Sequence, residues 1–175
     1  KLLGNVFGLH LRADSPSGQV CYRVDDLHHR MTLYPGNEDS LAYLGWEVGS
    51  EAGLDALAES LTADGADVRA LGADVCEERA VKRGYSLQGP DGIRLELFFG
   101  GLTDCNPPVF RSGVSGFNTG DLGMGHVVLV SADRDNALKW YQDKLGFLLS
   151  DHIHWDGIEA TFLHCNPRHH SLALI

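Results

Sequence analysis

Histidines at the start of two apolar tracts are the residues of this sequence best suited to chemistry. His126 opens the apolar run at 127–130, and the pair His169 and His170 precedes the apolar run at 171–175. A buried imidazole is costly unless it is bonded, and imidazole titrates near neutral pH and binds metals. Two strands of one curved sheet can aim these rings at a common point. The pattern therefore predicts a metal site or a reacting substrate at that point.

Strand alternation predicts which histidine of the pair faces that point. His169 and His170 are adjacent, so on a strand they point to opposite faces. His170 is in phase with Leu172 and Leu174, which predicts that His170 points inward and His169 outward or to the rim. The alternative is a backbone-bonded strand histidine at His126 and a solvated pair at a hairpin end.

Four other histidines also occur in pairs. His28 and His29 occupy the place in an earlier tract that His169 and His170 occupy in the later one. We interpret them as relics of duplication or as surface groups rather than as a second active site. His152 and His154 lie two apart on one expected strand and share a face. Two such rings can bind zinc, but a solvated polar face is the favoured interpretation.

Two amphipathic helices must position these groups. In the first, Ser50 is a suitable N-cap and Gly65 ends the helix. In the second, Asp133 is the expected N-cap and Gly146 ends the helix. Strands are expected at 6–13, 19–24, 29–34, 41–48, 68–71, 84–88, 93–99, 126–131, 147–154, 160–164 and 170–175. Residues 41–100 and 123–175 therefore both predict a βαβββ unit.

The βαβββ pattern divides the chain into modules. Residues 1–100 form an expected N-terminal domain, made of a partial module at 1–36, which opens on a helix that ends at Gly4, and a complete module at 41–100. A connector rich in Gly, Pro, Ser and Asn covers 101–122. Residues 123–175 form the first module of a C-terminal catalytic domain whose fourth module is absent. The fold class is α+β with repeated βαβββ modules, truncated at both ends, so we expect a piece of a longer polypeptide.

Composition excludes several functions. The 175 residues carry a net charge of −10, with no basic cluster and no apolar run of the roughly 20 residues that span a bilayer. We therefore expect no nucleic-acid or membrane partner. The four cysteines are scattered without a CxxC motif, which favours reduced thiols and a cytoplasmic location. No GxGxxG, P-loop, GxSxG or HExxH motif supports nucleotide binding or familiar hydrolase chemistry.

Three tracts together resemble a known family. They are Gly-Met-Gly-His126-Val-Val, the helix and turn at 135–147, and the run Phe-Leu-His-Cys-Asn-Pro-Arg-His-His-Ser at 162–171. They resemble the type I extradiol ring-cleavage dioxygenases of the vicinal oxygen chelate (glyoxalase-like) superfamily, and within it the 2,3-dihydroxybiphenyl 1,2-dioxygenase branch. The superfamily is built from paired βαβββ modules.

The resemblance implies a role for each site residue. His126 is implied to be a metal ligand of a 2-His-1-carboxylate set, with the other two ligands outside this chain. His170 is implied to be the catalytic acid/base group. Val128 and Phe162 match pocket-wall positions, and His169 lies with them. The implied cofactor is Fe(II), with Mn(II) as the alternative.

The implied activity is extradiol cleavage of a catechol with insertion of both atoms of O2. A bicyclic catechol such as 2,3-dihydroxybiphenyl is the expected substrate, the intact enzyme is expected to be a homo-oligomer, and the 175-residue piece alone is expected to be inactive. Two alternatives stay open. One is a glyoxalase-like isomerase or lyase, and the other is a metal-free small-molecule binding protein of the same fold.

Overall fold

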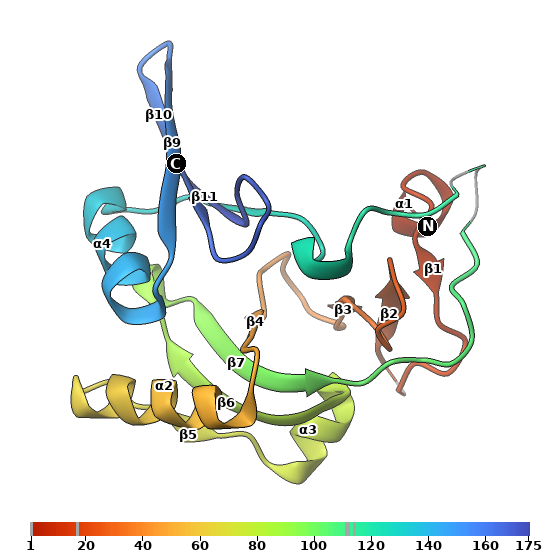
Figure 1. Ribbon diagram of the computed structural model, residues 1–175. Coiled ribbons are helices and arrows are strands. Elements are labelled where there is room, and N and C mark those ends of the chain that lie inside the picture. The colour runs from red at the N-terminus through yellow and green to blue at the C-terminus, as the bar shows by residue number, and fades with distance from the viewer. Residues whose placement is uncertain (1, 17, 111–112, 114) are drawn as a thin grey trace.

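The computed structural model describes residues 2–16, 18–110, 113 and 115–175, which form three β-sheets and their covering helices (Figure 1). The N-terminal part begins with helix α1 (Leu2–Asn5). It continues with strands β1 (His10–Leu11), β2 (Val20–Arg23) and β3 (Met31–Leu33), which pair antiparallel in the order β1-β2-β3.

The middle of the chain forms a complete unit. Its elements are β4 (Leu44–Glu47), α2 (Glu51–Ala63), β5 (Arg69–Ala70), α3 (Ala73–Arg79), β6 (Val81–Gln88), the 3-10 turn η1 (Pro90–Gly92) and β7 (Arg94–Gly101). The sheet order is β4-β7-β6-β5, and β4 runs parallel to β7.

The C-terminal part repeats this topology. The 3-10 turn η2 (Gly120–Leu122) leads into β8 (Val127–Leu129), α4 (Arg134–Leu145), β9 (Leu148–Trp155), β10 (Ile158–His164) and β11 (Leu172–Leu174). The order is β8-β11-β10-β9, with β8 parallel to β11. Both sheets thus place the first and last strands of a βαβββ unit side by side, which confirms the α+β class.

The ends of the two long helices have local causes. The Ser50 side chain accepts a hydrogen bond from the backbone N–H of Gly53 at 3.0 Å, and Asp133 accepts one from Asn136 at 3.1 Å. Both satisfy backbone donors that a helix N-terminus leaves without partners. Gly146 ends α4 in the left-handed region at φ 69°, a conformation that glycine adopts without steric cost.

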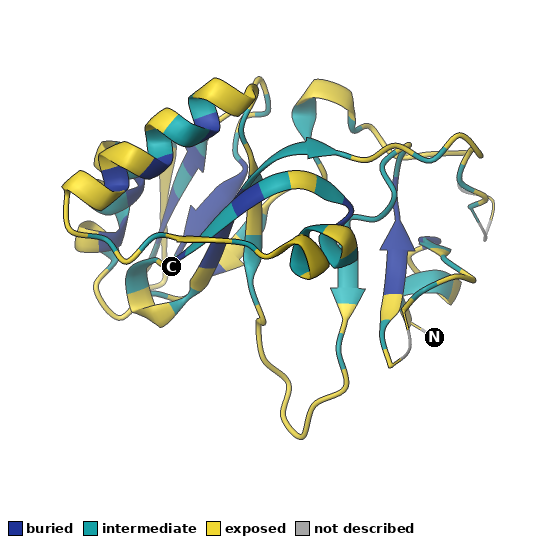
Figure 2. Cartoon of the chain, turned by 90° about the horizontal axis from the view of Figure 1, so that it is seen from below, coloured by how far each residue is buried: buried dark blue, intermediate teal, exposed yellow. Residues whose placement is uncertain are grey.

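The two βαβββ units share one hydrophobic core (Figure 2). It joins Leu54, Leu95 and Leu97 of the middle unit with buried residues of the C-terminal unit, including Tyr141 and Leu163. Trp46 and Phe147 meet edge to face across the junction, with ring centroids 4.9 Å apart. The face of the C-terminal sheet that is covered by α4 therefore packs against the middle unit.

The N-terminal part departs from the expected pattern. The strand expected at 6–13 is reduced to β1, His10–Leu11, and the helix expected to end at Gly4 continues through it to Asn5. The chain at 6–9 is occupied instead by the helix end, where Val6 donates its N–H to Leu2 and Leu9 donates to Leu3. Lys1, in the same expected helix, and positions 111, 112 and 114 of the expected connector lie outside the described residues.

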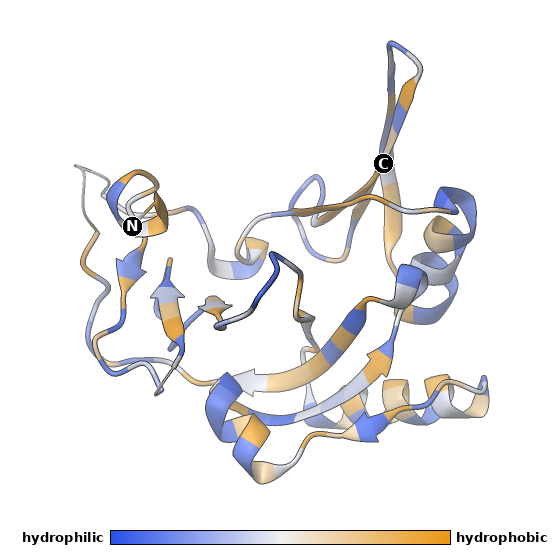
Figure 3. Cartoon of the chain, turned by 180° about the vertical axis from the view of Figure 1, so that it is seen from behind, coloured by the Kyte–Doolittle hydropathy of each residue, from blue (hydrophilic) through white to orange (hydrophobic). Residues whose placement is uncertain are grey.

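The β9–β10 hairpin projects from the body of the molecule (Figure 1). Hydrophobic residues run through β8 toward α4 (Figure 3).

In the part of the chain that the structure describes, no helix has the length and apolarity to cross a membrane.

Candidate functional site

The structure brings His126 and His170 together. Their ring centroids are 4.4 Å apart, and the ring of His170 also lies 4.8 Å from that of Phe162. His126 is exposed, whereas His170 and Phe162 are half-buried. The predicted meeting of the two rings is confirmed, although each histidine lies before its strand, which begins at Val127 in one case and at Leu172 in the other.

Sheet register explains which face this is. Ala173 pairs with Val128 on one side and with Phe162 on the other, and residues directly opposite on neighbouring strands share a face. His126 stands just before β8, and its ring lies on the same side because it meets the ring of His170, which in turn meets that of Phe162. Val128 is 48% exposed, which makes the face an open one with apolar and imidazole side chains.

This register corrects the predicted phase of His170. Leu172 and Leu174 flank Ala173 and so point to the opposite face from Phe162 and Val128. His170 nevertheless contacts His126, as predicted, because β11 begins only at Leu172 and the chain bends before it. The bend, and not strand alternation, turns the His170 ring toward His126.

His169 is exposed and lies beside His170. Their Nδ1 atoms are 3.0 Å apart and their rings meet edge to face at 5.3 Å. One of the two nitrogens must donate a proton to the other, so the tautomers of the two rings are linked. Burial lowers the pKa of His170 below its ordinary value, and charge at His126, His169 and Arg168 lowers it further.

A β-bulge holds the loop that carries the pair. Phe162 pairs with Asp151 and Leu163 pairs with Leu149, which leaves Ser150 as the extra residue of β9. Its hydroxyl donates to the carbonyl of His169 and lies 2.6 Å from Nδ1 of His164. Sequence reasoning missed Ser150 because a bulge has no signature in the alternation of β9.

The first histidine pair repeats the geometry of the second. Nδ1 of His28 and Nδ1 of His29 are 2.8 Å apart, and their rings meet edge to face at 5.1 Å. Both residues are half-buried, so they are not plain surface groups. Burial lowers the pKa of His29 to about 4, with smaller contributions from charge at His28 and Arg12.

The other sequence candidates lie elsewhere. His152 and His154 lie on β9, which is mostly exposed, and face Glu159 of β10 at 3.9 and 3.8 Å. A surface cavity of about 580 Å³ lies between α2 and β6 and is lined by residues such as Asp55, Arg83 and Tyr85. No histidine lines it, so we place the candidate site at His126 and His170.

His126 has the chemistry of a metal ligand but lacks partner ligands among the described residues. An exposed imidazole has the ligand chemistry that iron, manganese and zinc accept. Within residues 2–16, 18–110, 113 and 115–175, however, no group of three His, Cys, Asp or Glu side chains is arranged to hold an ion. His126 thus fits as one ligand, and further ligands are needed to complete a site.

Known proteins resemble this chain in sequence and in fold. Residues 123–175 match the model of the Glyoxalase/Bleomycin resistance protein/Dioxygenase superfamily. The chain is 41% identical to a 3-methylcatechol 2,3-dioxygenase of Pseudomonas putida over 93% of its length, and 37% identical to a biphenyl-2,3-diol 1,2-dioxygenase of Pseudomonas sp. strain KKS102 over 94%. An iron-dependent extradiol dioxygenase of Rhodococcus jostii is 34% identical over 100% of the chain.

The structural comparison agrees. The crystal structure of BphC, a halotolerant catechol dioxygenase, superposes with a TM-score of 0.93 at 33% identity over 99% of this chain and 58% of that one. The chain spans about three fifths of the length of the curated relatives it matches, namely 58%, 58% and 60% of the three named above.

Proposed function

Because residues 123–175 match the glyoxalase/bleomycin resistance protein/dioxygenase superfamily, we propose that this chain is part of an Fe(II)-dependent extradiol dioxygenase. The proposed reaction cleaves a catechol beside its two hydroxyl groups and inserts both atoms of O2. We further propose that residues 1–100 form the N-terminal domain, that 101–122 connect it to the catalytic domain, and that 123–175 form that domain's first module. A fourth module would then complete the site.

One observation carries the proposal: His126 and His170 meet on an open sheet face beside the apolar Val128 and Phe162. A metal ligand must be accessible, and His126 is exposed. A proton-transfer group must lie close to the reacting atoms, and His170 is in contact with the ligand ring. The iron-dependent relative supports Fe(II) as the ion.

The assignment of His126 as a ligand defines what this chain contributes to the metal. Bound Fe(II) would act as a template that holds catechol and dioxygen together and supports electron transfer between them. His126 supplies one nitrogen of a 2-His-1-carboxylate set, which leaves open positions for both reactants. The second histidine and the carboxylate are proposed to come from polypeptide beyond these 175 residues.

His170 is proposed to hold and move the proton. Because burial lowers its pKa, the ring is neutral near pH 7 and is ready to accept a proton from a reactant oxygen. The Nδ1 contact with His169 at 3.0 Å orients the ring and links its tautomer to that of His169. Neighbouring rings of His126 and Phe162 limit its rotation further.

The positions of Val128 and Phe162 indicate which part of the substrate these side chains contact. Val128 and Phe162 share the face of His126, so a non-reacting apolar substituent of the catechol is proposed to lie against them while water is displaced. The relatives' names describe catechols that carry a methyl or a phenyl group next to the hydroxyls. We propose that the bicyclic substrate, 2,3-dihydroxybiphenyl, is preferred over 3-methylcatechol.

The test uses the full-length protein, reconstituted with Fe(II) or with Mn(II) without oxygen. Metal content, oxygen uptake and the appearance of a yellow product are measured after air and either catechol are added. We expect turnover with Fe(II) and one O2 consumed per catechol. His126→Ala should lose metal and turnover, whereas His154→Ala, a change on the exposed hairpin, should keep both.

The outcomes separate the possibilities. Full metal content and turnover in His126→Ala would remove the ligand assignment. Activity only with Mn(II) would show that Mn(II), and not Fe(II), is the ion. Faster turnover of 3-methylcatechol would show that it, and not 2,3-dihydroxybiphenyl, is the preferred substrate. The 175-residue chain alone is expected to be inactive, and turnover by it at the full-length rate would contradict the need for outside ligands.

A further inference from the structure

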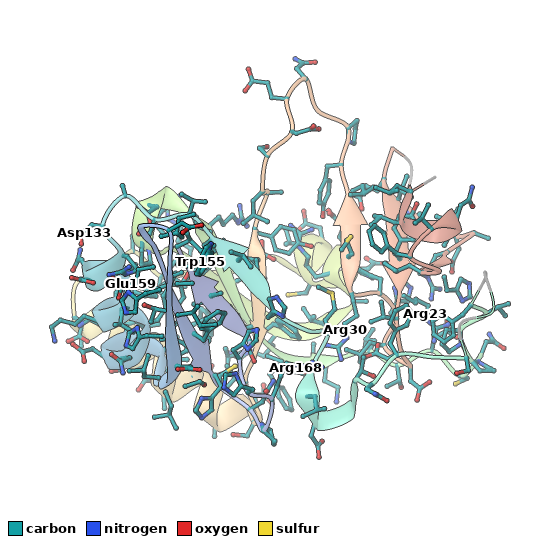
Figure 4. The ribbon with its side chains drawn as sticks, turned by 90° about the horizontal axis from the view of Figure 1, so that it is seen from above. Arg23, Arg30, Asp133, Trp155, Glu159 and Arg168 are labelled. Atoms are coloured by element: carbon teal, nitrogen blue, oxygen red, sulfur yellow. The ribbon has the colours of Figure 1, made fainter. Side chains whose placement is uncertain are left out.

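Arg168 directs its guanidinium group at three backbone carbonyls of one segment. Its Nε donates to the carbonyl of Leu122 at 2.9 Å, and its Nη2 donates to those of Asn118 at 3.1 Å and Gly123 at 3.4 Å. In Figure 4 it lies between the C-terminal sheet and the segment that contains η2. Among the residues that the structure describes, its guanidinium hydrogen bonds go to carbonyls and not to a carboxylate, so the planar fork is used for geometry rather than for charge pairing.

The segment that Arg168 holds leads directly to the proposed metal ligand. After Leu122 the chain passes through Gly123 at φ 66° and Gly125 at φ 152°, and the next residue is His126. Two glycines this close give the backbone wide freedom. His126 also stands before the first residue of β8, Val127, so strand pairing alone does not determine where its ring lies.

The loop that carries Arg168 also carries His170. Arg168 precedes His170 by two residues, and its backbone N–H donates to Oδ1 of Asn166 at 2.9 Å. The Asn166 Nδ2 in turn donates to the carbonyl of Leu122 at 3.2 Å. Two side chains of the 165–170 loop therefore bind one carbonyl in the approach to His126.

We propose that Arg168 is a positioning residue that sets the distance between His126 and His170, with Asn166 as its support. This inference rests on the proposed function, in which the two rings act on the same reactants. Arg168 itself does not touch the reacting atoms. It joins the loop of one ring to the flexible approach of the other, and so limits how far they can move apart.

The test compares three substitutions in the full-length protein. Arg168→Lys keeps the positive charge but loses the planar fork, and Arg168→Met removes both. The matched control is Arg134→Lys, because Arg134 pairs with carboxylates of Asp135 and Glu159, which a lysine ammonium also binds. For each protein we would measure the Fe(II) dissociation constant, kcat and KM, the thermal unfolding midpoint, and the His126–His170 ring separation in a metal-free crystal structure.

We expect both Arg168 variants to bind Fe(II) about 10–100-fold more weakly and to lose kcat by a similar factor, with a smaller change in KM, as is typical when a group behind a metal ligand is removed. The ring separation should increase beyond the present 4.4 Å. Arg134→Lys should resemble the unaltered protein in all of these measurements. If Arg168→Met does not fold, Arg168→Lys provides the same comparison.

Several results would overturn the inference. They are an unchanged ring separation and Fe(II) affinity in both variants, a loss of thermal stability alone, or full function in Arg168→Lys, which would reduce the role to charge. Failure of the proposed function is a different result: the unaltered protein would then show no catechol cleavage. The ring separation in Arg168→Lys would still decide whether Arg168 positions the histidines.

Discussion

Removal of the Ser150 hydroxyl should destabilise the protein, although removal of a second serine hydroxyl in the same module should not. Ser150 is the bulged residue of β9, and its one hydroxyl proton is donated to the carbonyl of His169. The 2.6 Å contact with Nδ1 of His164 must then use the ring N–H as donor. Ser150→Ala leaves both groups without this partner.

The magnitude follows from these two contacts. A hydrogen bond contributes about 0.5–1.5 kcal/mol net, and a buried group left without a partner costs about 1–3 kcal/mol. The His169 carbonyl bond lies at an exposed position and the His164 contact at a partly buried one, so water can compensate in part. We expect Ser150→Ala to lower the free energy of unfolding by about 1–2 kcal/mol.

The matched control is Ser131→Ala. The Ser131 hydroxyl is buried and has no hydrogen-bond partner among the residues that the structure describes. Its removal deletes a desolvated polar group without breaking a bond, so the free energy of unfolding should change by less than about 0.5 kcal/mol or should rise. Ser150→Thr keeps a hydroxyl and should recover much of the loss.

The assay is denaturant-induced unfolding of the four proteins at one pH, followed by circular dichroism and by tryptophan fluorescence. Equal losses for Ser150→Ala and Ser131→Ala would refute the reasoning, because hydrogen bonding would then not separate the two sites. No loss for Ser150→Ala would show that the bulge does not hold the His169 carbonyl.

Three further predictions concern stability, pH and substrate binding. Glu96→Gln should cost about 3 kcal/mol in denaturant unfolding, because the carboxylate is 3% exposed and pairs with Arg79 and Arg94 at 2.9 Å; a loss below about 1 kcal/mol would contradict this. His29 has a pKa lowered from 6.5 to about 4, so below pH 6.5 the unfolded chain binds a proton that the folded chain refuses until about pH 4. The free energy of unfolding should therefore decrease as the pH is lowered from 6.5 to about 4, and His29→Gln should make this decrease smaller. An unchanged slope of stability against pH between pH 7 and 4.5 in His29→Gln would contradict this prediction. Phe162→Ala should raise KM for 2,3-dihydroxybiphenyl by about 10–100-fold and for 3-methylcatechol by less, since burial of a large apolar side chain contributes about 1.5–3 kcal/mol; equal effects on both catechols in steady-state assays would exclude contact with the second ring.

The repeated architecture was predictable from local signals. The caps Ser50 and Asp133, and the glycine that ends α4, act within a few residues along the chain. The apolar periodicity between these signals then determines helix and strand in order. The short N-terminal strand was not predictable in the same way, because residues 6–9 pack as a helix end, and only that packing decides against a strand.

The candidate site was predictable in its members but not in its construction. The resemblance singled out His126 and His170, and their contact is observed. The cause of the contact is different from the one expected, because the chain bends before β11 and register places Ala173 beside Phe162. Arg168 lies within the tract that carries the resemblance, so a signal for it existed, whereas its binding to the 118–123 carbonyls could not be read from spacing.

By itself, the sequence determined the two long helices, the order of most strands along the chain and the identity of the rings that could act, because these depend on side-chain type and on periodicity over a few residues. Only the tertiary structure decided that the rings meet, how the Ser150 bulge and Arg168 hold their loops, and which face stays open. Those outcomes depend on register between strands and on contacts between residues that lie 14 to 46 positions apart in the sequence. Pairings at that range arise from packing of the whole chain and leave no periodic signal in any one segment.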